Sequence, residues 1–225
     1  MSGWHPAAVL FDLDGTLVDT YRLYLECYRR ALAPYLGYPP RDNEIVSRRP
    51  SSERRFLEEW IGVEHTAACH AAMLEHYRAL HGALGEGLYD GVREMLAALR
   101  AGGLRLGIVT GKGRTAWETT ERALELGSFE VVVTDDDVRR PKPDPEGVLA
   151  ALRALGVPAA DALYVGDSAG DLRAGRSAGT RVAAALWPKT APGERDAFVE
   201  EIRPLAPDWA FEHPADLTRA LVRWC

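Results

Sequence analysis

Four short segments carry the residues of this sequence that could do chemistry. They are DLDGT (12–16), VTGK (109–112), RPKPDP (140–145) and GDSAGD (166–171). In the first, Asp12 and Asp14 stand two positions apart, directly behind an apolar run. Carboxylates so close together repel each other unless positive charge compensates them. We therefore expect cationic groups, from side chains or a metal ion, around this pair.

The elements that must position these segments follow from the hydrophobic pattern. Compact apolar runs with polar residues only at their C-terminal ends predict buried strands at 7–14, 104–112, 129–137, 161–168 and 180–187. Helical spacing of apolar residues predicts helices between them, for example at 90–103 and 144–157. This alternation predicts an α/β fold, a Rossmann-like parallel sheet sandwiched by helices.

One region interrupts the alternation. Residues 21–85 show only helical patterns, so we expect a small all-helical cap inserted after the first strand. The predicted domains are an α/β core, 1–18 and 88–225, and a cap, 19–87. Ligands of open parallel sheets bind beyond the carboxyl ends of the strands. The four polar segments should therefore meet at one crevice, beneath the cap.

In this order and spacing, and with an early helical insert, the segments resemble those of the haloacid dehalogenase superfamily. The similarity is to phosphoglycolate phosphatase-like and β-phosphoglucomutase-like members with a helical cap of the C1 type, and it extends over nearly the whole chain. It implies a Mg²⁺-dependent phosphatase that hydrolyses a small phosphorylated metabolite, of the phosphoglycolate or sugar-phosphate type, through an aspartyl-phosphate. A phosphomutase of the β-phosphoglucomutase kind and an inorganic pyrophosphatase are the alternatives within the family.

The resemblance assigns roles to the four aspartates. Asp12 is the expected nucleophile, and Asp14 would protonate the leaving alcohol and then deprotonate the attacking water. Asp12, the backbone carbonyl of Asp14 and Asp167 are the expected magnesium ligands, since Mg²⁺ prefers oxygen. Asp171 is expected at the metal site as well, where it would steady the metal-bound waters or Lys142.

Other residues are expected to bind the substrate. Thr110, the amide of Gly111 and Lys142 would hold the phosphoryl oxygens, and Lys142 would balance charge in the transition state. In the cap, Arg48 and Arg49 could bind a substrate carboxylate or a second phosphate, or they could form part of a solvated helix face.

Two further groups of residues each have two alternative roles. Lys112 and Arg114 offer a second possible anion grip, or a basic first helical turn without a substrate role. The cap histidines are spaced by five and six residues and do not share one helical face as metal ligands would. We expect them to be exposed or to pack within the cap: His65, His70, His76 and His81.

Each segment has an ordinary structural explanation as well. A lone D-x-D is common in solvated loops, Lys142 between prolines could be a surface residue, and GDSAGD could be a turn before an N-capped helix. Their coincidence at successive strand ends favours the functional interpretation.

The alternative functions differ in the residues and domains that they require. Mutases of the family usually carry Val or Ile at the position of Thr16, which favours a phosphatase here. A dehalogenase would have no use for Asp14, and a receiver-like binding module would not need a helical cap. A catalytically silent relative that uses its cap to bind a partner stays open, although no substitution in the four segments would disable it.

Composition limits the partners. The net charge of −6 and the pI near 5.6 argue against a nucleic-acid binder. Three distant cysteines suggest neither a disulfide framework nor a zinc site. The N-terminal residues lack the pattern of a signal peptide or membrane span, so we expect a cytoplasmic protein, monomeric or homodimeric, with no membrane partner.

Overall fold

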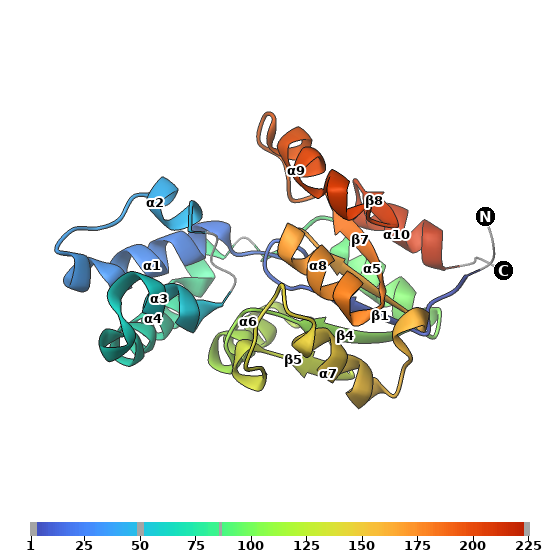
Figure 1. Ribbon diagram of the computed structural model, residues 1–225, viewed down its shortest axis with the longest axis horizontal. Helices are drawn as coiled ribbons and strands as arrows, with labels where there is room; N and C mark the ends of the chain where they lie inside the picture. Colours follow the sequence, from blue (N-terminus) through green and yellow to red (C-terminus); the bar gives the residue numbers. More distant parts are fainter. Residues whose placement is uncertain (1–3, 49–51, 86, 223–225) are drawn as a thin grey trace.

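The predicted strands align in one parallel sheet. The computed structural model describes residues 4–48, 52–85 and 87–222. The sheet has six strands in the order β5-β4-β1-β6-β7-β8, and every neighbouring pair is parallel. Their bounds are β1 Ala8–Phe11, β4 Arg105–Val109, β5 Val131–Val133, β6 Ala162–Gly166, β7 Arg181–Ala185 and β8 Trp209–Phe211. Because β1 lies between β4 and β6, the residues that follow it lie beside the ends of both neighbours (Figure 1).

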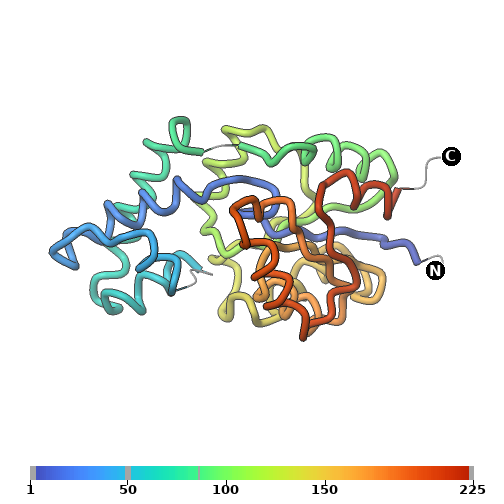
Figure 2. Tube along the Cα trace, turned by 90° about the horizontal axis from the view of Figure 1, so that it is seen from above, coloured from blue at the N-terminus to red at the C-terminus, as the bar shows by residue number. Residues whose placement is uncertain are grey.

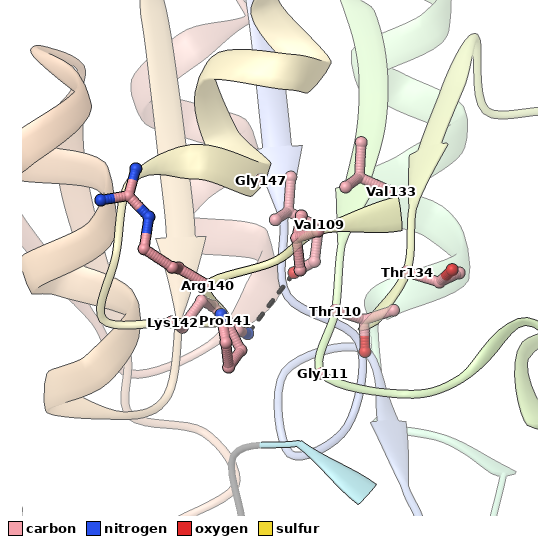
Figure 3. Close-up of a pocket in the computed structure, with 10 residues that line it drawn as sticks. Val109, Thr110, Gly111, Val133, Thr134, Arg140, Pro141, Lys142 and Gly147 are labelled. Atoms are coloured by element: carbon pink, nitrogen blue, oxygen red, sulfur yellow. Dashed lines mark hydrogen bonds between the residues drawn. The ribbon is translucent and has the colours of Figure 1, made fainter. Parts of the chain in front are cut away.

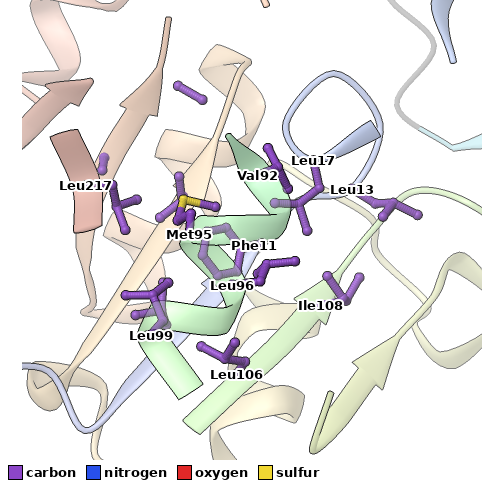
Figure 4. Packing of buried hydrophobic residues seen from close by; sticks show 14 of the residues in the cluster. Phe11, Leu13, Leu17, Val92, Met95, Leu96, Leu99, Leu106, Ile108 and Leu217 are labelled. Carbon is purple, nitrogen blue, oxygen red and sulfur yellow. The ribbon is translucent and has the colours of Figure 1, made fainter. Parts of the chain in front are cut away.

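Helices cover both faces of this sheet, as predicted. One face carries α5 Val92–Ala101 and α10 Pro214–Leu221, and the other carries α7 Glu146–Leu155 and α8 Ala169–Ala178. Successive residues of a strand point to opposite faces. Val9 and Phe11 accordingly pack in the first layer, where Figure 4 shows Phe11 among α5 side chains, while Ala8 and Leu10 pack in the second. This two-sided burial explains the continuous apolar runs of the sequence.

A separate helical unit lies at one end of the sheet. It consists of α1 Tyr21–Leu36, α2 Asp42–Val46, α3 Glu53–Ile61 and α4 Val63–Leu84, which share one apolar cluster together with Ala116. We call these helices the cap, and the sheet with its helices the core. Figure 1 shows the cap beside the core, and Figure 2 shows the same arrangement from above. The predicted helical cap is therefore confirmed.

A two-stranded ladder joins the cap to the core, and the sequence did not predict it. β2, Val18–Asp19, pairs antiparallel with β3, Gly87–Leu88. Strands of two residues are too short to show a periodic pattern. Both predicted domain boundaries fall within this ladder, and the extents of the two domains stay a prediction.

The remaining elements complete the core. They are α6 Arg114–Leu124 and α9 Glu194–Ile202, while β8 followed by α10 forms the C-terminal part of the core. Cys27 and Cys69 are buried free thiols, and burial raises the pKa of Cys27 to about 12 and that of Cys69 to about 11. Cys225 lies outside the described residues. None of the helices in the described ranges has the length and apolar character needed to cross a membrane.

Candidate active site

Lys142 connects two of the predicted acids at the carboxyl ends of the central strands. Its Nζ donates to Oδ1 of Asp12, which follows β1 directly, and to Oδ1 of Asp171, and both distances are 2.7 Å. The side chains of Lys142 and Asp12 are about one-tenth exposed, and that of Asp171 is buried. Residues 130 positions apart in the sequence thus form one buried ion pair.

Burial and charge oppose each other in this ion pair. Burial raises the pKa of Asp12 well above its usual value, while Lys142 opposes that shift. Burial also disfavours the charge of Lys142, but Asp12 and Asp171 outweigh it and hold its pKa well above the usual value. The ammonium group of Lys142 is therefore charged. This one positive charge faces two carboxyl groups, those of Asp12 and Asp171.

Three of the four predicted acids form a cluster. Asp12, Asp167 and Asp171 each offer a carboxylate oxygen, and these atoms lie within 4.8 Å of one another. Oδ1 of Asp167 accepts from Thr16 Oγ1 at 3.1 Å, and Oδ2 accepts from Lys189 Nζ at 2.7 Å. Burial raises the pKa of Asp167, with Lys189 opposing. A largely buried cluster of carboxylate oxygens of this kind suits a hard divalent cation such as Mg²⁺, which prefers oxygen ligands.

Asp171 is fully engaged with protein groups. Oδ1 also accepts from Tyr164 Oη at 3.2 Å, and Oδ2 accepts from the amide and the hydroxyl of Ser168. Ser168 and Asp171 form the capping box of α8. The structural and the functional explanation of GDSAGD are therefore both correct, because Asp171 belongs to the capping box of the helix and also binds Lys142.

The side chain of Asp14 lies outside the acid cluster. Its Oδ1 accepts from Thr20 Oγ1 at 2.5 Å and lies 2.9 Å from Lys112 Nζ. The side chain is 24% exposed. Gly15 follows with φ near +80°, a conformation that L side chains rarely adopt, and this turn leads the chain from β1 toward the cap.

Thr110, Gly111 and Lys142 all line a small pocket at the end of β4 (Figure 3). The amide of Thr110 donates to Val133 of β5, whereas the amide of Gly111 donates to none of the described residues. An unpaired amide beside a buried lysine can bind an anion. The lining residues are Val109, Thr110, Gly111, Val133, Thr134, Val138, Arg140, Pro141, Lys142 and Gly147.

The predicted anion-binding residues of the cap and of α6 have other contacts. Arg48 is exposed and its guanidinium lies over the ring of Trp60, 4.2 Å from the centroid; Arg49 lies outside the described residues. A substrate contact of either arginine stays a prediction. Lys112 is 1% exposed and Arg114 pairs with Asp137, which favours the second of the two alternatives, a basic first turn without a substrate role. Each already has a carboxylate partner within the protein.

Sequence reasoning missed several residues of the site. Lys189 was overlooked although it follows the predicted strand at 180–187, in the position where the other site residues follow theirs. Tyr164 and Thr20 were missed because nothing in their local sequence distinguishes them from ordinary strand and helix-cap residues. Of the cap histidines, His70 binds the buried Glu53 at 3.0 Å and His81 is buried, as packing residues would be.

Comparisons with known proteins agree with this geometry. A sequence profile of the haloacid dehalogenase-like hydrolase family matches residues 9–185. The chain is 36% identical over 214 residues to pyrophosphatase PpaX of Bacillus velezensis, covering 93% of this chain and 94% of that protein. It is 33% identical over 222 residues to N-acetylmuramic acid 6-phosphate phosphatase of Pseudomonas aeruginosa, covering 96% and 95%.

A solved structure supports the same assignment. The crystal structure of a hydrolase from Pseudomonas syringae superimposes with a TM-score of 0.79 at 26% identity, covering 96% of this chain and 97% of that one. The predicted family and the predicted enzyme class, a phosphatase of that family, are confirmed. The chain belongs to the haloacid dehalogenase-like hydrolase family.

Proposed function

We propose that this hydrolase is a Mg²⁺-dependent phosphatase that cleaves a small phosphorylated metabolite through a phosphoaspartyl intermediate on Asp12. The observation that carries the proposal is the buried Asp12 carboxylate, held 2.7 Å from Lys142 beside two further acids. A carboxylate can attack a phosphoryl group only where the negative charge of both is compensated. The relatives named as a pyrophosphatase and a sugar-phosphate phosphatase support the same class of reaction.

The proposed reaction has two steps. An oxygen of Asp12 forms a bond to phosphorus while the bond to the leaving oxygen breaks, and Asp14 gives that oxygen its proton. Water then attacks the phosphorus of the phosphoaspartate, Asp14 takes a proton from the water, and Asp12 is released as a carboxylate together with phosphate. Asp14 suits both proton transfers because its side chain is partly exposed and lies outside the acid cluster.

Asp12, Asp167 and the backbone carbonyl of Asp14 would hold the magnesium ion. When bound, the ion would neutralise part of the charge on the nucleophile and the phosphoryl oxygens. Asp171 is the weakest candidate for a direct ligand, because its two oxygens accept four hydrogen bonds from protein donors, whereas those of Asp167 accept two. We assign it the alternative role, that of fixing Lys142.

Lys142, Thr110 and the amide of Gly111 would bind the phosphoryl oxygens. Lys142 reaches Asp12 directly, so its charge lies where the attack takes place. Preorganised donors of this kind stabilise the charge that develops in the transition state. Arg48 and Arg49 are kept as candidates for contacts to the remainder of the substrate.

Phosphoglycolate and sugar phosphates are the proposed substrates. Pyrophosphate is the second candidate, because the relative at 36% identity is named as a pyrophosphatase. The phosphomutase alternative would need the phosphoryl group to return to a sugar instead of passing to water. We further propose a cytoplasmic protein, monomer or homodimer, without a nucleic-acid or membrane partner.

The test is phosphate release from a panel of small phosphate esters and pyrophosphate, with and without Mg²⁺. We expect turnover that needs the metal and is lost in Asp12→Asn. Asp90→Asn is the matched control, because the side chain of Asp90 is fully exposed and the charge change is the same. Turnover that survives in Asp12→Asn would overturn the proposal. Silence across the panel would favour the mutase, tested next with a sugar 1-phosphate and the corresponding bisphosphate.

A further inference from the structure

A core lysine is enclosed between the core and the cap. Lys112 lies two residues beyond Thr110 and is 1% exposed, although its side chain is charged. Its Nζ lies 2.9 Å from Oδ1 of Asp14 and 3.2 Å from Oγ1 of Thr120 on α6. Taking an ammonium group out of water is costly unless it is paired and hydrogen-bonded. The residues that enclose Lys112 are therefore informative.

The cap supplies much of this enclosure. The Nζ of Lys112 lies 4.9 Å from the ring centroid of Tyr24 on α1 and 4.6 Å from that of Tyr77 on α4. The hydroxyl of Tyr77 also accepts a hydrogen bond from this nitrogen at 2.5 Å. Aromatic faces attract a desolvated cation. Burial opposes the charge of Lys112, but Asp14 and Tyr77 outweigh it and raise its pKa above the usual value.

The side-chain contacts that Asp14 makes with the described residues are all on one oxygen. Oδ1 is shared by Thr20 Oγ1 at 2.5 Å and Lys112 Nζ at 2.9 Å. Within the described ranges, Oδ2 accepts no hydrogen bond from a protein donor. Two donors on one oxygen fix the rotation of the carboxylate and leave the other oxygen available.

We propose that Lys112 is a positioning residue that couples the cap to Asp14. With Tyr24 and Tyr77 placed over its ammonium group, Lys112 and Thr20 anchor Oδ1 and leave Oδ2 to exchange protons with the leaving group and with water. A displaced cap would remove both rings and expose Lys112 to solvent, which would loosen its hold on Asp14. This inference rests on the proposed function, in which Asp14 is the acid and base.

The test compares substrates with different leaving groups, because a poor leaving group depends most on receiving a proton from Asp14. Lys112→Met keeps most of the side-chain volume and removes the ammonium group. For the alkyl phosphate that the panel ranks first, we expect kcat/KM to fall about 10- to 100-fold, which is part of the roughly 10²- to 10⁴-fold that general acid–base catalysis contributes. For p-nitrophenyl phosphate, whose leaving group needs no proton, we expect a several-fold smaller loss. Lys112→Arg should restore part of the alkyl activity.

Controls separate this role from a structural one. Arg55→Ala removes a different contact between cap and core, the bond to the backbone oxygen of Arg139 at 3.0 Å, and should leave the ratio of the two rates unchanged. Tyr77→Phe, which removes only the hydroxyl, should shift the ratio in the direction of Lys112→Met. If Lys112→Met does not fold, as judged by its circular dichroism, Lys112→Arg and Tyr77→Phe carry the test.

Asp14→Asn separates the acid role of Asp14 from the positioning role of Lys112. If Asp14→Asn lowers kcat/KM for both substrates equally, the acid role in the proposed function fails. If Asp14→Asn lowers kcat/KM selectively for the alkyl phosphate, whereas the Lys112 and Tyr77 variants lower kcat/KM for both substrates equally, the positioning role of Lys112 is overturned.

Discussion

Gly15 shows how tightly the residues of the site are packed. Its φ is near +80°, and a Cβ at this position would lie 2.6 Å from Oδ2 of Asp167. In Gly15→Ala we expect the free energy of unfolding to fall by about 1–2 kcal/mol from backbone strain alone. The methyl group should also displace the Asp167 carboxylate and weaken Mg²⁺ binding. Urea unfolding and a calorimetric Mg²⁺ titration measure the two effects separately.

Gly37 provides the matched control for this substitution. Its φ is near +76°, and a Cβ there would meet no atom within 4 Å. Gly37→Ala should therefore show the same loss of stability with unchanged Mg²⁺ affinity. Equal Mg²⁺ affinity in Gly15→Ala and the unsubstituted protein would contradict the role assigned to Asp167.

The residues of the site could be predicted where strand ends carry them. Asp12, Asp167 and Asp171 end or follow apolar runs, and the structure brings them together with Lys142. The partners that complete the site could not be predicted in this way. The contact of Lys112 with Tyr77, 35 positions away, depends on how the cap sits on the core, which no local pattern encodes.

Among the elements, α4 carries a buried histidine whose pKa is lowered. His81 is buried near the C-terminal end of α4, and its Nε2 has no hydrogen-bond partner among the described residues. Burial lowers the pKa of His81, and Lys112 acts in the same direction while Asp14 opposes both. A lowered folded pKa means that the unfolded state binds the proton more readily. The stability contribution is complete above the unfolded pKa of about 6.5 and is lost as pH falls through the folded pKa.

We therefore expect stability to fall more steeply with acid in the unsubstituted protein than in His81→Leu. The measurement is the free energy of unfolding in urea at several pH values from 7.5 to 5. His65→Leu, at an exposed position of the same helix, should follow the unsubstituted protein. A parallel decline in His81→Leu would show that His81 does not contribute.

The main elements could be predicted because their patterns are long. The five apolar runs correspond to β1 and β4 to β7, and the helical insert corresponds to α1–α4. The ladder of β2 and β3 was beyond reach, because each strand has two residues and its partner lies about 70 positions away. Such pairing depends on how the cap returns to the core.

At the scale of the whole molecule, the arrangement of cap and core predicts a lid. Two adjacent connections, β2 and β3, join the cap to the core. Other contacts between cap and core include the hydrogen bond from Ser52 to Asp135 and the contacts of the cap with the buried Lys112. Short connections of this kind can act as hinges for a lid. We expect Mg²⁺ with vanadate, an analogue of phosphate, to shift the population to the closed form and lower the radius of gyration in small-angle scattering. Identical scattering curves with and without these ligands would contradict lid motion.

The central claim is that Asp12 receives the phosphoryl group. The most direct measurement is to stop turnover of the preferred substrate with acid and reduce the protein with borohydride, which converts a phosphoaspartate to homoserine. Peptide mass spectrometry then locates the converted residue. We expect homoserine at position 12 only when Mg²⁺ and substrate are both present. Efficient turnover with no modification at Asp12, or with modification at another carboxylate, would contradict it.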